Sequence, residues 1–186
     1  MPVTDEQIAS KVQGGDKESF GLLLERYEDK IVRYARKFFS NDQDIEDLVQ
    51  ESFIKAYSNI NSFDASRKFS PWLYRIAHNE FVNLLKKRSK SSFFSLDVDA
   101  LFPHPVAKET ADGELNAWDL KQALNQTLDK LDVKYREPLV LFYLQELSYQ
   151  EISDVLELPI STVGVRIQRG RGQLKILYEE KYGRHE

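Results

Sequence analysis

The chain has 186 residues, of which 41% are hydrophobic and 30% are charged, a composition typical of a folded globular protein rather than a disordered one. It contains no cysteine, which excludes disulfides and thiolate chemistry, and its three histidines are scattered without metal-ligand spacing. We therefore expect neither a metal nor another cofactor. The longest apolar run, residues 139–144, is too short to span a bilayer, and the N-terminus lacks a signal sequence, so no membrane insertion and a cytoplasmic location are expected.

The net charge of −4 conceals a strong segregation of charge along the chain. Residues 67–90 carry seven cations against one anion, and residues 158–178 carry four cations and no anion. Residues 1–66 and 91–132 are acidic, each with five more anions than cations. Because the position of charge matters more than its sum, the two basic segments are candidate sites for a nucleic acid.

Apolar residues recur with helical spacing along most of the chain, and alternating strand patterns are hard to find, so we predict an all-α fold. We expect two small helical domains, residues 1–90 and 117–186, joined by a flexible linker at residues 91–116. Thr4 with Gln7 can cap a first helix that ends at residues 14–15, and Asp16 can cap a second. The second helix carries one apolar stripe: Phe20, Leu23, Leu24, Tyr27, Ile31, Tyr34 and Phe38.

A third helix begins near Asp42 or Asp44 and has one apolar and one acidic face. Its inner face consists of Ile45, Leu48, Val49, Ser52, Phe53 and Ala56. The absence of a nearby histidine or glycine-rich phosphate loop argues against catalysis by its carboxylates. A solvated face is the usual explanation of such charge, but an apolar side chain lies on this outer side as well, which favours a docking surface. Its candidate residues are Asp44, Asp47, Gln50, Glu51 and Ile54.

The next segment interleaves aromatic rings with cations and asparagines, and a fourth helix is predicted to follow Pro71. Rings can stack unpaired bases, asparagines can bind base edges, and cations can hold phosphates. The alternative is that Trp72, Ile76 and Phe69 belong to the core, and we favour that interpretation for Trp72. The candidates for nucleic-acid contact are Asn61, Phe63, Arg67, Lys68, Phe69, Arg75, Asn79, Asn83, Lys86, Lys87 and Arg88.

From about residue 89 to 114 the helical period disappears among serines, prolines and acidic residues, which indicates a linker. It is too apolar for an inert tether, and we expect some of its large side chains to dock on a partner or on the domains: Phe93, Phe94, Leu96, Leu101 and Phe102. Beyond it, apolar spacing predicts a helix marked by Trp118, Leu120, Leu124, Leu128 and Leu131, and a short buried helix over residues 138–144.

Residues 147–169 have the pattern of a helix-turn-helix. Ser148 and Glu151 form a capping box, and Pro159 ends the first helix. The second helix is predicted to begin near Ser161 or Thr162. Such patterns also occur in proteins that do not bind DNA. Here, however, the basic residues begin where the recognition helix is expected, which favours DNA binding. The candidate contacts are Ser161, Thr162, Val165, Arg166, Arg169 and Arg171, of which we assign Thr162 and Arg166 to base edges and Arg169 and Arg171 to phosphates.

Some residues of this motif oppose regular structure. Glu157 occupies the turn, where glycine adopts a left-handed conformation more easily. Gly164, Gly170 and Gly172 each weaken a helix by about 1 kcal/mol relative to alanine. We therefore expect a short recognition helix that is ordered mainly by its neighbours or by DNA.

With these residues placed, the chain from about residue 16 to 178 resembles the bacterial extracytoplasmic-function (ECF) sigma factors, two-domain members of the RNA polymerase sigma family. Residues 44–53, DIEDLVQESF, look like the core-polymerase-binding helix of the family. Residues 69–79, FSPWLYRIAHN, look like its promoter-melting segment, and residues 147–169 are similar to its helix-turn-helix for the −35 element. Asn83 stands where the family commonly has aspartate and Gly164 where a basic residue is frequent, so the promoter sequence does not follow from the resemblance.

The resemblance implies a sigma factor, not an enzyme, that binds core RNA polymerase and recognises promoter DNA as a duplex at −35 and as a single strand at −10. It also implies that residues 16–90 bind the clamp helices and capture an unstacked base, that the linker enters the polymerase near its active-site channel, and that an anti-sigma protein holds the factor inactive. Two alternatives remain open. One is a helix-turn-helix regulator that binds duplex DNA without acting as a sigma factor, and the other is a polymerase-binding decoy that recognises no promoter.

Overall fold

The computed structural model describes residues 3–88, 127 and 130–182, and all regular structure in these ranges is helical. The chain divides into two compact units, residues 1–93 and 94–186. The predicted linker at 91–116, the apolar residues 93–102 within it, and most of the helix expected around Trp118 lie outside the described residues. The all-α prediction is confirmed.

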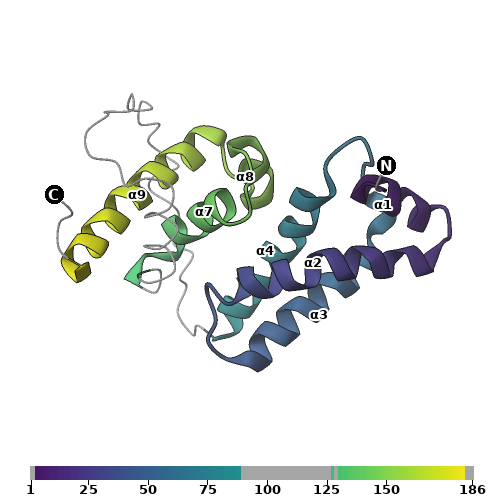
Figure 1. The fold of residues 1–186 in the computed structure, drawn as a ribbon, viewed down its shortest axis with the longest axis horizontal. Helices are drawn as coiled ribbons and strands as arrows, with labels where there is room; N and C mark the ends of the chain where they lie inside the picture. The colour runs from purple at the N-terminus through teal and green to yellow at the C-terminus, as the bar shows by residue number, and fades with distance from the viewer. Residues whose placement is uncertain (1–2, 89–126, 128–129, 183–186) are drawn as a thin grey trace. The chain divides into compact units, whose positions relative to one another are not determined.

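The first unit contains α1 (Asp5–Gln13), α2 (Phe20–Ala35), α3 (Asp42–Ser58) and α4 (Phe69–Arg88), with short 3₁₀ helices η1 (Lys17–Ser19) and η2 (Ile60–Ser62). Helix α3 packs against both α2 and α4 (Figure 1). The largest fully buried side chains of the unit come from α1, α2 and α4: Ile8, Leu23, Ile31, Tyr34, Phe69, Leu73, Tyr74 and Phe81.

The predicted helix starts agree with the structure in some places and differ in others. Thr4 and Gln7 form the expected capping box of α1. Asp16 caps η1 rather than α2 itself, because one 3₁₀ turn intervenes before Phe20. Helix α4 begins at Phe69, not after Pro71, because proline is tolerated in the first turn, where its missing N–H has no intrahelical partner anyway.

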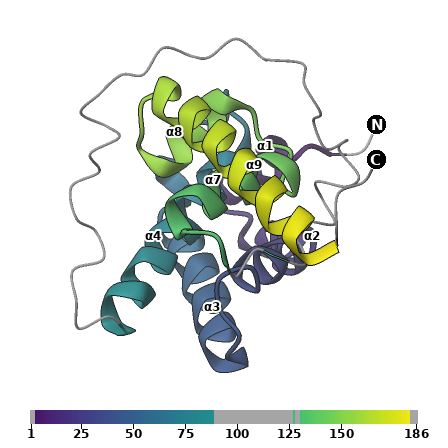
Figure 2. The same ribbon diagram turned by 90° about the vertical axis from the view of Figure 1, so that its left-hand side faces the viewer.

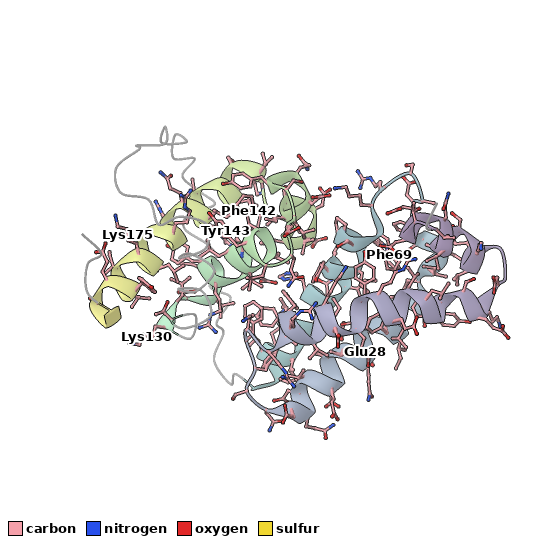
Figure 3. The ribbon with its side chains drawn as sticks, viewed as in Figure 1. Glu28, Phe69, Lys130, Phe142, Tyr143 and Lys175 are labelled. Carbon is pink, nitrogen blue, oxygen red and sulfur yellow. The ribbon has the colours of Figure 1, made fainter. Side chains whose placement is uncertain are left out.

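The second unit contains α7 (Val133–Tyr143), α8 (Tyr149–Leu156) and α9 (Ile160–Tyr182), and α9 packs on both of the others (Figure 2). Helix α7 starts five residues before the predicted 138, with Pro138 inside it. Phe142 and Tyr143 lie at its C-terminal end (Figure 3), and the Phe142 ring packs edge-on against Tyr149 at a centroid distance of 5.1 Å. The core of this unit includes Leu139, Val140, Leu141, Ile152, Val155, Val163, Ile167 and Leu174.

The expectation of a short recognition helix is wrong, because α9 runs for 23 residues through all three glycines. Tertiary packing overrides the low helix propensity of glycine here. Val163, Ile167 and Leu174 are buried along one side, and Gly170 on the same side is the point of closest approach to α7. A Cβ at residue 170 would lie 2.8 Å from Leu139 Cδ1 and 3.2 Å from Tyr135 Cβ.

Two glycine-to-alanine substitutions in α9 should therefore have opposite effects on stability. Gly170→Ala forces α7 and α9 apart and should lower the free energy of unfolding by about 1–3 kcal/mol. Gly172→Ala meets no atom within 4 Å of the new Cβ and should raise it by up to about 1 kcal/mol. Urea unfolding followed by circular dichroism measures both. Equal stability of the two variants would contradict the close approach at Gly170.

Candidate functional site

The outer face of α3 is a mixed acidic and apolar surface. Asp47, Gln50 and Glu51 are exposed, and Asp44 is half-buried at the N-terminal edge. Ile54, on the same outward side, is 58% exposed, which is large for an isoleucine in a folded unit. The Gln43 amide donates to Asp47 Oδ1 at 3.0 Å, so the carboxylate is oriented along the helix surface. The structure thus brings all five predicted docking residues onto one helix, with Asp44 the least accessible.

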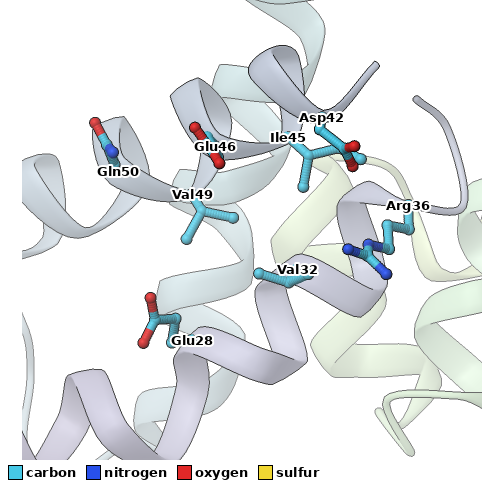
Figure 4. A pocket seen from close by; sticks show the side chains of 8 residues that line it. All are labelled: Glu28, Val32, Arg36, Asp42, Ile45, Glu46, Val49 and Gln50. Carbon is cyan, nitrogen blue, oxygen red and sulfur yellow. The ribbon is translucent and has the colours of Figure 1, made fainter. Parts of the chain in front are cut away.

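A groove between α2 and α3 adjoins this face (Figure 4). Its α3 side extends the acidic surface, while its α2 side presents residues that the sequence analysis did not single out: Glu28, Val32 and Arg36. These three recur every four residues, so they share one side of a helix. That spacing is visible in the sequence, but only the packing of α2 on α3 shows that these residues border the acidic face of α3. The groove is lined in full by Glu28, Val32, Arg36, Asp42, Ile45, Glu46, Val49 and Gln50.

An ion pair joins the acidic helix α3 to the basic helix α4. Lys55 Nζ lies 2.6 Å from Glu80 Oε1 on α4 and 3.6 Å from Glu51 Oε1 on its own helix. The hydrogen bond to Glu80 is the main reason that the pKa of Lys55 is raised. Glu80 is the single anion between residues 67 and 90. Lys55 compensates the charge of the Glu80 carboxylate. The exposed polar side chains of α4 are therefore cations and amides.

The exposed face of α4 carries the predicted polar candidates. Arg75, Asn79, Asn83 and Lys86 are exposed and recur at intervals of three or four residues, so they form one stripe along the helix. Lys87 is also exposed, and Arg88 is the last residue of the helix. The arrangement places two amide side chains between cations, which suits contact with bases flanked by phosphates.

The loop between α3 and α4 is ordered by its own hydrogen bonds. Asp64 Oδ1 accepts from the Ser66 backbone N–H at 2.9 Å and from the Ser66 hydroxyl at 2.7 Å, and these bonds lower the pKa of Asp64. The Arg67 N–H donates to the Asp64 carbonyl at 2.9 Å. The predicted contact residues Asn61, Arg67 and Lys68 are all exposed on this loop.

The prediction that Phe63 and Phe69 stack on bases is wrong. Phe69 is 0% exposed and Phe63 is 5% exposed, so neither ring has a free face. Phe69 lies inside the unit at the start of α4 (Figure 3), with its ring edge-on to Phe63 at 5.4 Å. Trp72, which we assigned to the core, is only half-buried and packs on both rings at 5.3 and 5.5 Å. Trp72 also precedes Asn79 by two helical turns, which places the indole at the end of the polar stripe.

Two serines make the hydrogen bonds that define α8 and the turn of the helix-turn-helix: Ser148 at the start of the helix and Ser153 near its end. Ser148 and Glu151 make the predicted capping box of α8. Glu157 adopts the left-handed conformation that the turn requires, with φ of 54°. The Ser153 hydroxyl donates to the Leu158 carbonyl at 2.5 Å, and the Leu158 N–H returns to the Ser153 carbonyl at 3.2 Å. Ser153 thus closes the turn, a role that its sequence position alone did not reveal.

The predicted contacts on α9 differ in accessibility. Ser161 is exposed, and Val165, Arg169 and Arg171 are half-exposed. Thr162 is only 8% exposed, so its assignment to a base edge is corrected: it lies too close to the packed side of the helix. Arg166 is half-buried, and this burial lowers the pKa of its guanidinium. Gln168, which the sequence analysis passed over, is exposed between Val165 and Arg169 on the outward face.

Two kinds of site are not found in residues 3–88 and 130–182. No three histidine, cysteine or carboxylate side chains gather there as a metal site would require. No helix of these ranges has the length and hydrophobicity needed to cross a membrane.

Comparisons with known proteins agree with this arrangement. The sequence model of sigma-70 region 2 matches residues 23–91, and that of sigma-70 region 4 matches residues 121–174. The chain is 37% identical over 181 residues to the ECF RNA polymerase sigma factor SigW of Bacillus subtilis, covering 94% of this chain and 97% of the relative. It is 35% identical to the ECF RNA polymerase sigma-E factor of Escherichia coli K12 over 91% of both chains.

Solved structures show the same fold. CnrH, solved in complex with the cytosolic domain of CnrY, aligns with a TM-score of 0.67 at 26% identity over 95% of this chain and 97% of that one. The sigma factor RpoE of Bartonella quintana, solved with the anti-sigma factor NepR, aligns with a TM-score of 0.63 at 28% identity over 90% and 99%. The matches to both sigma-70 regions, the identity to relatives over more than nine-tenths of the chain, and the order of an acidic helix, a basic helix and a helix-turn-helix lead to one conclusion: the chain belongs to the ECF sigma factors of the sigma-70 family.

Proposed function

We propose that the two units divide the work of promoter recognition. The outer face of α3 binds core RNA polymerase, the α3–α4 loop and the polar stripe of α4 hold the opened −10 element, and α9 reads the −35 duplex. The observation that carries this assignment is the separation of charge on adjacent helices: exposed carboxylates on α3, and exposed cations and asparagines on α4 with Glu80 neutralised by Lys55. A protein that bound only DNA, a polyanion, would gain nothing from the exposed carboxylates of α3, so a second partner is expected at that helix.

Run-off transcription with core polymerase tests this function. A sigma factor gives promoter-specific transcripts with core polymerase alone. An ordinary helix-turn-helix regulator needs another sigma factor, and a decoy gives no transcript on any template. Either of the last two results would overturn the proposed function.

The factor contributes binding energy rather than a chemical step. Stacking in DNA averages about 1.4 kcal/mol per base-pair step, so opening a few pairs costs several kcal/mol. Base contacts and phosphate contacts by residues of α4 offset this cost, while RNA synthesis belongs to the polymerase. The protein is in this proposal a non-enzymatic initiation factor that acts in the cytoplasm.

We also propose that an anti-sigma protein controls this factor. The support is that two solved structures with the same fold contain such partners or a partner's cytosolic domain. The exposed Ile54 with its neighbouring carboxylates offers a surface on which an inhibitor would exclude the polymerase. The expected result is that the purified inhibitor competes with core polymerase for the wild type, and that direct binding of the inhibitor is weakened in Ile54→Glu.

For the upstream element we assign base contact to Gln168, which is exposed on the outward face of α9, and phosphate contact to Arg169, Arg171 and Lys175. Gln168→Ala should weaken binding to the preferred −35 duplex by about 1–3 kcal/mol and relax the preference at one position. Arg171→Ala should weaken all sequences alike and lower the slope of log affinity against log salt by about one. Fluorescence anisotropy with a set of single-base variants measures both.

Arg166→Ala serves as the comparison in this series. Because Arg166 is half-buried, its truncation should lower the melting temperature as well as the affinity, whereas Gln168→Ala should leave the melting temperature unchanged. Relaxed specificity in Arg171→Ala as large as in Gln168→Ala would contradict these roles.

A further inference from the structure

Helix α1 is hydrogen-bonded to the loop that precedes α4. The side-chain amide of Gln13, the last residue of α1, donates to the Ile60 carbonyl and to the Phe63 carbonyl, both at 2.8 Å. A carboxamide has two N–H groups, so one side chain satisfies two loop carbonyls. Gln13 is partly buried, and the residues it joins are 47 and 50 positions away in sequence. These two hydrogen bonds therefore hold the first residues of the loop, 60–63, against α1.

A second contact from the same helix fixes the end of the loop. The Phe69 backbone N–H, the first of α4, donates to Glu6 Oε1 at 3.1 Å. The first N–H groups of a helix have no partner inside it, and a carboxylate at this end also interacts favourably with the helix dipole. Glu6 thus acts as a capping group for α4 supplied by another helix. Together Glu6 and Gln13 hold both ends of residues 60–69.

Helix α1 is itself anchored firmly enough to act as a support. Its inner side buries Ile8, Ala9 and Val12. At its start, Asp5 pairs with Arg26 and accepts a hydrogen bond from the Tyr27 hydroxyl at 2.6 Å. The Tyr27 ring in turn packs edge-on against Phe69 at 5.5 Å.

The side chains of this loop that are proposed to contact DNA are exposed to solvent. Ile60 and Phe63 are buried, whereas Asn61, Arg67 and Lys68 are exposed. A loop that is already ordered loses less conformational entropy when it binds, so more of the contact energy is available to hold an opened strand. Release of the loop from α1 would remove this advantage without removing any side chain that contacts DNA.

We propose that α1 is a positioning element for strand opening, with Gln13 and Glu6 as its positioning residues. This inference rests on the proposed role of the loop in holding the −10 strand. Helix α1 precedes residue 23, where the match to sigma-70 region 2 begins, so the match assigns it no part. Neither positioning residue contacts DNA in this proposal; each acts on the backbone of the loop.

The test uses the full chain in holoenzyme with core polymerase and a promoter carrying 2-aminopurine in the −10 element. Gln13→Met keeps the length of the side chain without its donors, and Gln13→Glu places a carboxylate against two carbonyl oxygens. Gln7→Glu is the matched control on the same helix, because glutamate serves in a capping box as well as glutamine does. Closed-complex affinity, the rate of the fluorescence rise and the melting temperature are measured for each.

The expected result is an opening rate about 3- to 10-fold lower in Gln13→Met and lower still in Gln13→Glu, with closed-complex affinity unchanged and Gln7→Glu equal to wild type. Glu6→Ala should also slow opening, whereas Glu6→Gln, which keeps an oxygen for the Phe69 N–H, should retain most of the rate. Opening at the wild-type rate in both Gln13 variants would overturn the inference. A loss of core binding or of closed-complex affinity in parallel with the rate would also overturn it, because the helix would then have only a general structural role.

Asn61→Ala and Arg67→Ala separate this inference from the function on which it rests. If neither loop variant slows opening, the loop does not hold the strand and the proposed role of the loop is wrong. If both slow opening while the Gln13 variants do not, the loop has its role but α1 does not position it.

Discussion

Asp47→Arg is expected to lower the affinity for core RNA polymerase by at least tenfold while leaving the fold intact. Asp47 is exposed on the outer face of α3, where its carboxylate accepts a hydrogen bond from Gln43 of the same helix. Replacing an exposed carboxylate away from the core usually changes stability by less than about 0.5 kcal/mol, whereas a like charge placed across a charged interface costs several kcal/mol. Binding is measured with labelled chain and purified core polymerase, and stability by circular dichroism.

Asp29→Arg is the matched control, because Asp29 is an exposed carboxylate of α2 that does not line the groove between α2 and α3. It makes the same change in net charge and should leave core affinity near that of the wild type. Ile54→Glu should weaken binding as Asp47→Arg does, since it removes the apolar part of the same face. Equal core affinity for Asp47→Arg and Asp29→Arg would rule out the outer face of α3 as the docking surface.

The double substitution Asn79→Ala with Asn83→Ala should slow promoter opening by one to two orders of magnitude. Both asparagines are exposed on α4, between Arg75 and Lys86 on the same stripe. Each lost base-edge hydrogen bond to the open strand is expected to cost about 1 kcal/mol, which for two residues corresponds to a factor of about 30. The rise in fluorescence of 2-aminopurine in the −10 element reports the opening rate, while core binding and −35 binding should not change.

A template with a pre-melted bubble at −10 should restore much of the lost transcription, because the strands no longer have to be separated at the expense of binding energy. The control is Glu25→Ala with Asp29→Ala, two exposed polar residues of α2 that are four positions apart, as Asn79 and Asn83 are, and lie away from the stripe. Wild-type opening by the asparagine variant on duplex promoters would show that the base is captured elsewhere, and Trp72 would then be the next residue to substitute.

Local sequence signals determined much of this protein. Capping boxes at Thr4 and Ser148 and the apolar spacing of α2 and α3 located helices correctly, because these signals act within one or two turns of the chain. The sequence also placed Glu157 in the turn, at a position where glycine would adopt a left-handed conformation more easily, and Glu157 has a φ of 54° there. The charge segregation between α3 and α4 follows from the order of the residues alone, and it predicted an acidic face and a polar stripe that the structure shows to be exposed.

Tertiary structure decided what depends on contacts between distant residues. Whether Phe63, Phe69 and Trp72 are free or buried depends on which helices cover them, and periodicity gives the side of a helix but not its neighbour. The length of α9 was misjudged because the propensity of Gly170 is a local quantity, whereas its close approach to Tyr135 and Leu139 arises only in the packed unit. The bonds from Gln13 to Ile60 and Phe63 span about a quarter of the chain, so no local pattern predicts them. The sequence alone therefore determined which helices form and which charges they carry, while packing determined which side chains remain available for DNA.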